Sequence, residues 1–161
     1  IILLLLISNL MNSLHTTIIC SLTFVGIRYL GGGVHLSTYL RCLIGSLTIL
    51  LIFGKAATYN IELQRFLFIF LIVNILGIYS IFRWVPAGTE KRTISDKFER
   101  LKQKRKTMIF FLCGSFIVVA CLYYDLYFVA NAITYGLFSA IFLITPLGYT
   151  VMNRIDKVLD N

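Results

Sequence analysis

Long apolar runs, separated by short polar segments, limit what this chain can fold into. A run of about 20 apolar residues is long enough to cross the hydrocarbon of a bilayer as a helix. The 161-residue chain is 58% hydrophobic and only 14% charged, which is not the composition of a soluble domain. We therefore expect an all-α, multi-pass membrane protein.

The pattern predicts about five apolar helices, one of them broken or re-entrant. Their expected ranges are 1–27, 38–53, 66–82, 108–124 and 128–149. The first range is longer than a span requires and is polar around Asn12, which favours a tilt or a break there. Its polar face should meet protein or a water-filled cavity. The last should end near Pro146, with Arg154 and Lys157 in a polar tail.

Positive charge is concentrated in one segment between apolar runs. The formal net charge is +8, and nine of the fifteen Lys and Arg residues fall between Arg83 and Lys106. Such clusters mark a cytoplasmic loop against anionic lipid more often than a nucleic-acid groove. We expect membrane lipid, and no nucleic acid, as the partner of a cytoplasmic loop over 83–107. Within it, Ser95 should cap a short helix that runs through Lys104.

A possible nucleophile and a possible base come close together only between Arg28 and Cys42. On a continuous helix, the seven residues from His35 to Cys42 correspond to roughly 10 Å along the axis. A direct hydrogen bond needs about 3 Å. The three glycines 31–33 permit a bend that removes this obstacle. If the loop 83–107 is cytoplasmic, the alternation of spans places this stretch near the same face.

The residues after the bend predict how the cysteine is presented. Ser37 or Thr38 is a suitable N-cap for a helix that carries Cys42 in its early turns. A thiolate there gains from the helix dipole, and Arg28 or Arg41 adds to that effect.

Other interpretations of these residues stay open on spacing alone. A polar helix start followed by a packed thiol is the commoner situation, and His15 is a rival base. The remaining cysteines lie in apolar runs, without CxxC or zinc-ligand spacing, so neither a disulfide framework nor a metal site is expected. These cysteines are Cys20, Cys113 and Cys121. We expect no cofactor, since no ATP or metal motif is present.

Two separated elements resemble one known family. Arg28-x4-Gly33-x-His35-x6-Cys42 is followed by Pro86-Ala87-Gly88-Thr89-Glu90-Lys91-Arg92 and a second basic cluster. Together, and in this order over essentially the whole chain, they resemble accessory gene regulator protein B. That family comprises multi-pass cell-membrane cysteine endopeptidases that process the autoinducing-peptide precursor in Gram-positive quorum sensing.

The resemblance implies a specific reaction on a precursor signalling peptide. His35 would act as the general base for Cys42, whose thiolate attacks a peptide carbonyl so that the C-terminal tail leaves and a thioester forms. A cysteine or serine within the peptide would then release a cyclic thiolactone or lactone. The resemblance also implies one transmembrane peptidase domain over 1–161 that lacks the family's amphipathic N-terminal region, and a homodimer.

Several further residues are candidates for supporting this site. Arg28 and Gly33 belong to the first element, and Arg28 would bind a substrate carboxylate, support the glycine turn or sit at the interface. Ser46 and Asn74 would orient the imidazole or donate to an oxyanion, although interhelical hydrogen bonding is their commoner role. The remaining candidates, expected to meet an acidic part of the peptide, are Lys91 and Arg92.

Two alternative functions use the same residues differently. A non-enzymatic membrane transport or partner-binding subunit would contain the Gly/His/Cys segment as a packed helix break, and would tolerate Cys42→Ser. Another membrane-bound thiol acyltransferase would share the Cys42 chemistry and differ in its substrate.

Overall fold

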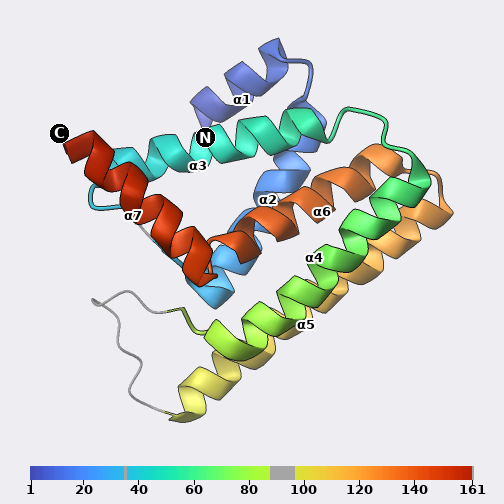
Figure 1. Ribbon diagram of the computed structural model, residues 1–161. Coiled ribbons are helices and arrows are strands. Elements are labelled where there is room, and N and C mark those ends of the chain that lie inside the picture. The colour runs from blue at the N-terminus through green and yellow to red at the C-terminus, as the bar shows by residue number, and fades with distance from the viewer. Residues whose placement is uncertain (35, 88–96, 161) are drawn as a thin grey trace.

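The computed structural model describes residues 1–34, 36–87 and 97–160, and its regular elements there are all helices (Figure 1). They are α1 (Ile2–Leu10), α2 (Leu14–Gly31), α3 (Tyr39–Ala56), α4 (Leu63–Trp84), α5 (Lys97–Tyr123), α6 (Tyr127–Phe142) and α7 (Pro146–Asp160). The predicted all-α fold is confirmed.

Four of these helices, α2 to α5, are long and apolar enough to cross a membrane. Helices α6 and α7 meet the same criterion only as a pair, and they are bent by 76° at the break between them. By length and composition the chain is therefore a multi-pass membrane protein with four spans, or five if the bent α6–α7 pair is one span. This number agrees with the expected count of about five, but the bent pair consists of α6 and α7 and does not lie near Asn12.

Helix α6 forms the centre of the bundle. It packs against α2, α3, α4 and α5, and most of its residues are buried. The small residues Ala132 and Gly136 allow neighbouring backbones to approach closely. On the side facing α3, Phe53 packs against Tyr135 and Phe138, with ring centroids 5.6 and 5.8 Å apart.

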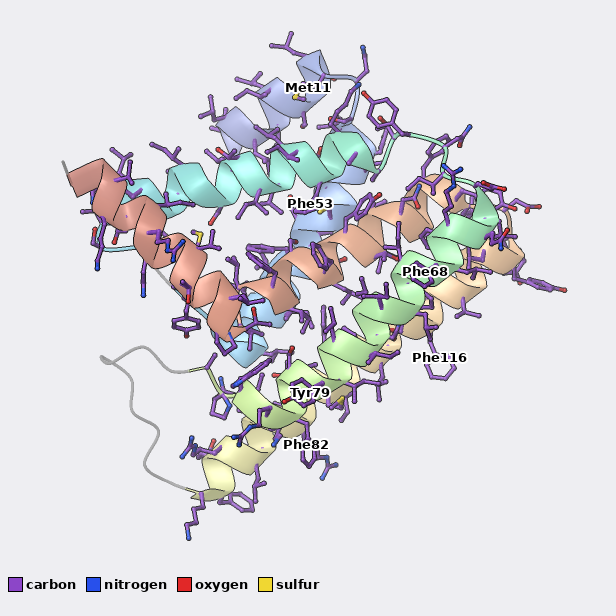
Figure 2. All side chains as sticks on the ribbon, in the orientation of Figure 1. Met11, Phe53, Phe68, Tyr79, Phe82 and Phe116 are labelled. Atoms are coloured by element: carbon purple, nitrogen blue, oxygen red, sulfur yellow. The ribbon has the colours of Figure 1, made fainter. Side chains whose placement is uncertain are left out.

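The outer faces of the long helices carry large apolar side chains. Phe68 and Phe82 on α4 and Phe116 on α5 are all more than half exposed and lie on the outside of the bundle (Figure 2). In water such a surface would be unfavourable, whereas against lipid tails it is the expected one.

The expected first span is divided into α1 and α2, as its polar middle predicts. Asn12, between the two helices, has a φ of 53°. In the first turn of α2, the Thr16 hydroxyl donates a 2.7 Å hydrogen bond to the Gly54 carbonyl of α3. The polar face of this segment therefore meets protein, and it fixes the far end of α3 against α2.

The expected end of the last span near Pro146 is confirmed by the end of α6 and the bend that follows it, but the helix after it was not predicted. Pro146 begins helix α7 rather than starting a polar tail, so Arg154 and Lys157 lie on a helix. Proline is well tolerated in the first turn of a helix because the N–H group that it lacks has no partner there. Figure 1 shows α7 running from the end of α6 toward the start of α3. Helix α7 thus lies across the end of the bundle rather than continuing the α6 span.

The prediction of separate elements before and after residue 107 is wrong. Helix α5 runs without interruption from Lys97 to Tyr123, so the short helix expected through Lys104 and the span expected from residue 108 are one helix. Its Lys, Arg, Glu and Gln residues are good helix formers, which is why the helix extends beyond the apolar run. Ser95, the expected cap, lies outside the described residues.

Candidate active site

The break between α2 and α3 begins at glycines whose conformations other residues rarely adopt. Gly32 has a φ of 76° and Gly33 a φ of 133°. A Cβ atom on Gly32 would overlap the carbonyl oxygen of Ala87, and one on Gly33 would overlap the Arg28 guanidinium. Glycine is therefore required here both by the backbone conformation and by the close approach of neighbouring groups.

Three backbone hydrogen bonds hold this glycine segment in place. Gly33 N–H donates to the Ala87 carbonyl at 3.2 Å, and Ala87 N–H donates to the Gly31 carbonyl at 3.0 Å. Val34 N–H donates to the Leu143 carbonyl at 3.1 Å. The segment is thus fixed to the residues after α4 and to the α6–α7 junction, and the two sequence elements that carry the family resemblance meet here.

Arg28, in the last turn of α2, supports the same segment with its side chain. One guanidinium nitrogen donates to the Val34 carbonyl at 2.6 Å, and the other donates to the Gly32 carbonyl at 3.3 Å. The guanidinium is also near enough to Cys42 on α3 and Tyr149 on α7 for a charge on either side chain to interact with it. Arg28 therefore lies at the point where α2, α3 and α7 meet.

Helix α3 starts as the sequence predicts, with Thr38 as its N-cap. The Thr38 hydroxyl accepts a hydrogen bond from Arg41 N–H at 3.4 Å, and the Thr38 carbonyl accepts one from Cys42 N–H at 3.1 Å. Cys42 consequently closes the first turn of α3, where its side chain is half-buried. The irregular segment 32–38 separates it from the end of α2.

Helix α7 contributes an acidic side chain to this region. The Asp156 carboxylate accepts hydrogen bonds from the Ser37 backbone N–H at 2.8 Å, the Ser37 hydroxyl at 2.9 Å and the Arg41 guanidinium at 3.1 Å. Burial raises the pKa of the Asp156 carboxyl, but these hydrogen bonds lower it by more, so its pKa lies below its usual range. Sequence reasoning missed this contact, because no local pattern relates α7 to α3.

Two candidate residues lie elsewhere in the bundle. The Asn74 side chain donates to the Phe70 carbonyl at 2.9 Å and accepts from the Ser115 hydroxyl at 2.8 Å, so it joins α4 to α5. Ser46, one turn beyond Cys42, lines an apolar groove of about 460 Å³ between α1, α2 and α3. Within the described ranges, neither side chain has a hydrogen bond to the glycine segment.

Three other predicted residues, His35, Lys91 and Arg92, lie outside the described residues. His15, the rival base, lies in the first turn of α2, whereas Arg28 lies in the last. At 1.5 Å per residue, about 20 Å of helix separates the two. His15 is therefore at the opposite end of α2 from Cys42.

The four cysteines occupy different surroundings, and none forms a disulfide. Cys20 and Cys121 are buried among the helices, and Cys113 is exposed on α5. In the ranges 1–34, 36–87 and 97–160, no group of three or more His, Cys, Asp or Glu side chains is arranged to hold a metal ion.

The fold and this region together define a class: a small multi-pass helical membrane protein with a cysteine at an N-capped helix start near a half-buried arginine. The family described as Accessory gene regulator B matches residues 1–144, and the chain therefore belongs to that family. Membership gives it a role in accessory gene regulation and, in general terms, in autoinducer processing. No curated protein and no solved structure matches the chain.

Proposed function

We propose that the chain is a membrane-embedded cysteine endopeptidase that removes the C-terminal tail of a precursor signalling peptide and promotes its cyclisation. Cys42 is the nucleophile and His35 the general base. The observation that carries this proposal is the helix break between Gly31 and Tyr39. It removes the continuous helix on which a seven-residue spacing would keep the two side chains roughly 10 Å apart.

The first chemical step forms a covalent intermediate. His35 takes the proton of the Cys42 thiol, and the sulfur attacks the scissile peptide carbonyl. The C–N bond then breaks, the imidazolium gives its proton to the departing amine of the tail, and a thioester joins the peptide to Cys42. The Arg28 guanidinium, which lies near Cys42, is suited to stabilise negative charge that develops there.

The second step closes the ring. A cysteine thiol or serine hydroxyl within the peptide attacks the thioester carbonyl, and the Cys42 sulfur leaves and recovers a proton. Thioester exchange is nearly balanced in free energy, whereas hydrolysis is strongly favourable. A site within the membrane that excludes water therefore favours cyclisation over loss of the peptide as a free acid.

The distribution of charge supports a site near the cytoplasmic face. The segment joined to Ala87 lies at the end of the bundle where α4 ends at Trp84, with Arg83 in its last turn, and where α5 begins. The first turns of α5 carry most of its positive charge. Basic residues of this kind face the cytoplasm. Lys91 and Arg92, in the connection between α4 and α5, are suited to meet the acidic tail of the precursor.

The proposal is tested by co-expressing the protein with its matching precursor peptide and following the peptide by mass. The parent should shorten the peptide, and Cys42→Ala and His35→Ala should leave it intact while remaining inserted in the membrane. Cys113→Ala and His15→Ala are the matched controls and should process the peptide normally. If Cys42→Ala processes the peptide at the parental rate, the chain is not a Cys42 peptidase, and a transport or partner-binding role becomes the better description.

A further inference from the structure

One carboxylate on α7 receives three hydrogen bonds from the residues that begin α3. Its Oδ2 accepts from the Ser37 N–H at 2.8 Å, and its Oδ1 accepts from the Ser37 hydroxyl at 2.9 Å and from Arg41 at 3.1 Å. The same Arg41 nitrogen donates to the Ser37 hydroxyl at 3.2 Å. Asp156 therefore holds α3 at both ends of the turn that leads to Cys42.

The local cap of α3 is weak without this contact. Arg41 N–H lies 3.4 Å from the Thr38 hydroxyl, beyond the usual range of about 2.7–3.2 Å for an N–H···O hydrogen bond. The segment before the cap contains two glycines with positive φ, which do not restrict the backbone by themselves. The carboxylate of Asp156 supplies the restraint that the capping residue does not.

Asp156 lies on the face of α7 that is turned toward the site. Tyr149, Met152 and Asp156 are spaced by three and four residues, so they share one face of the helix, and all three are at least partly buried. The closely packed helix pairs of the described residues all lie among α1 to α6. Side chains such as these, rather than close backbone packing, therefore hold α7 over the start of α3.

The Asp156–Arg41 ion pair differs from the others that the described residues form. Its side chains are 17% and 23% exposed, whereas those of Arg65–Glu62 and Lys102–Glu99 are at least half exposed. The other two pairs each join residues three apart on the chain, whereas Asp156–Arg41 joins two helices. Burial and additional hydrogen bonds make such a pair a stronger geometric restraint than an exposed one.

We infer that Asp156 is a positioning residue for Cys42: through Ser37 and Arg41, it fixes the first turn of α3 and so the place of the Cys42 sulfur. The inference rests on the proposed function of Cys42 as the nucleophile, and it assigns a role to α7, which lies beyond the matched residues 1–144. Displacing a reacting atom by about 1 Å can lower a rate a hundredfold. A less firmly held first turn of α3 should therefore lower the rate at which the Cys42 sulfur reacts.

The test uses iodoacetamide on the full chain in lipid nanodiscs, with each cysteine followed by mass spectrometry. In the parent, Cys42 should react faster than glutathione added to the same sample, which reports the reactivity of an accessible, unactivated thiol; Cys113 lies on the lipid-facing side of α5. Cys20 and Cys121 are buried and report global unfolding. In Asp156→Asn, Cys42 alkylation should fall about tenfold, with the other three cysteines unchanged, and Asp156→Glu should restore most of the rate. Asp125→Asn, at the opposite end of the bundle, is the matched control.

Two results would overturn the inference. Cys42 alkylation at the parental rate in Asp156→Asn would show that the carboxylate does not position the sulfur. Faster alkylation would show that α7 shields Cys42 instead. Failure of the proposed function looks different, because in that case Cys42 of the parent itself reacts no faster than the added glutathione. Amide hydrogen exchange over Ser37–Arg41, faster in Asp156→Asn than in the parent, provides a second measurement that does not depend on the thiol.

Discussion

Gly32 and Ala87, which belong to separate elements of the sequence, form a parallel β-bridge. Hydrogen bonds from Gly33 N–H to Ala87 and from Ala87 N–H to Gly31 complete the contact. The bridge joins the residues after α4 to the segment that leads to Cys42. The two parts of the chain that resemble the family are therefore one structural unit.

Replacing Gly32 with alanine should disrupt this unit. Its φ of 76° disfavours any side chain, and a Cβ would overlap the Ala87 carbonyl oxygen. We expect Gly32→Ala to lower the free energy of unfolding by about 1–3 kcal/mol and to abolish most peptide processing. Thermal unfolding in detergent and the mass assay measure the two effects. Gly114→Ala, where the nearest atoms lie 3.5 Å away on Leu137, should be nearly neutral; equal effects of both variants would contradict this explanation.

Arg28→Lys should impair processing although it keeps the positive charge. The guanidinium donates to two carbonyls, those of Gly32 and Val34, and a lysine ammonium cannot reproduce that planar, two-sided geometry. We expect at least a tenfold lower rate of tail removal, an order-of-magnitude figure for lost positioning. Arg154→Lys on the exposed face of α7 should match the parent. Parental activity in Arg28→Lys would mean that charge alone suffices.

Asn74→Ala should change stability rather than chemistry. Its amide pairs with Ser115 across the α4–α5 interface, and loss of such an interhelical hydrogen bond costs about 1 kcal/mol. The melting temperature should fall, while the processing rate per folded molecule stays the same. A rate loss at unchanged melting temperature would instead give Asn74 a direct part in the reaction.

The contact between Asp156 and α3 should stabilise the folded protein at neutral pH and lose that effect in acid. The hydrogen bonds from Ser37 and Arg41 keep the folded-state pKa of Asp156 below its usual range, so their contribution to stability is complete above the unfolded-state pKa. It is lost as the pH falls through the folded-state value, that is, below about pH 4. Asp156→Asn should therefore melt below the parent at pH 7, and the difference should narrow progressively as the pH falls below about 4. A difference that keeps the same size over this pH range would exclude this carboxylate as its source.

Much of the fold follows from local signals in the sequence. The apolar runs predict the spans, the polar residues around Asn12 predict the break between α1 and α2, and Thr38 is the cap that its position suggests. These features depend on residues a few positions apart. The three glycines 31–33 are a signal of the same local kind. Together with the roughly 10 Å that a continuous helix would place between His35 and Cys42, they predict that one helix ends before the helix of Cys42 begins.

Other features depend on pairs of residues that are far apart in the chain. Nothing in the sequence near Asp156 indicates that it contacts Ser37, and nothing near Ala87 indicates its bridge to Gly32. Proline interrupts helices but also starts them, so Pro146 predicts the end of the span before it without indicating the helix α7 that begins there after the 76° bend. The role of α7 at the candidate site could therefore not be predicted.

The most direct test of the central claim is to trap the acyl-enzyme. A precursor whose internal cysteine or serine is replaced by alanine cannot cyclise, so the thioester should accumulate. The protein is digested with trypsin, which yields a peptide from Cys42 to Lys55 that contains only this cysteine. We predict that this peptide carries the mass of the processed precursor fragment and loses it on treatment with hydroxylamine. Removal of the tail with no adduct on Cys42 would contradict a Cys42 thioester mechanism.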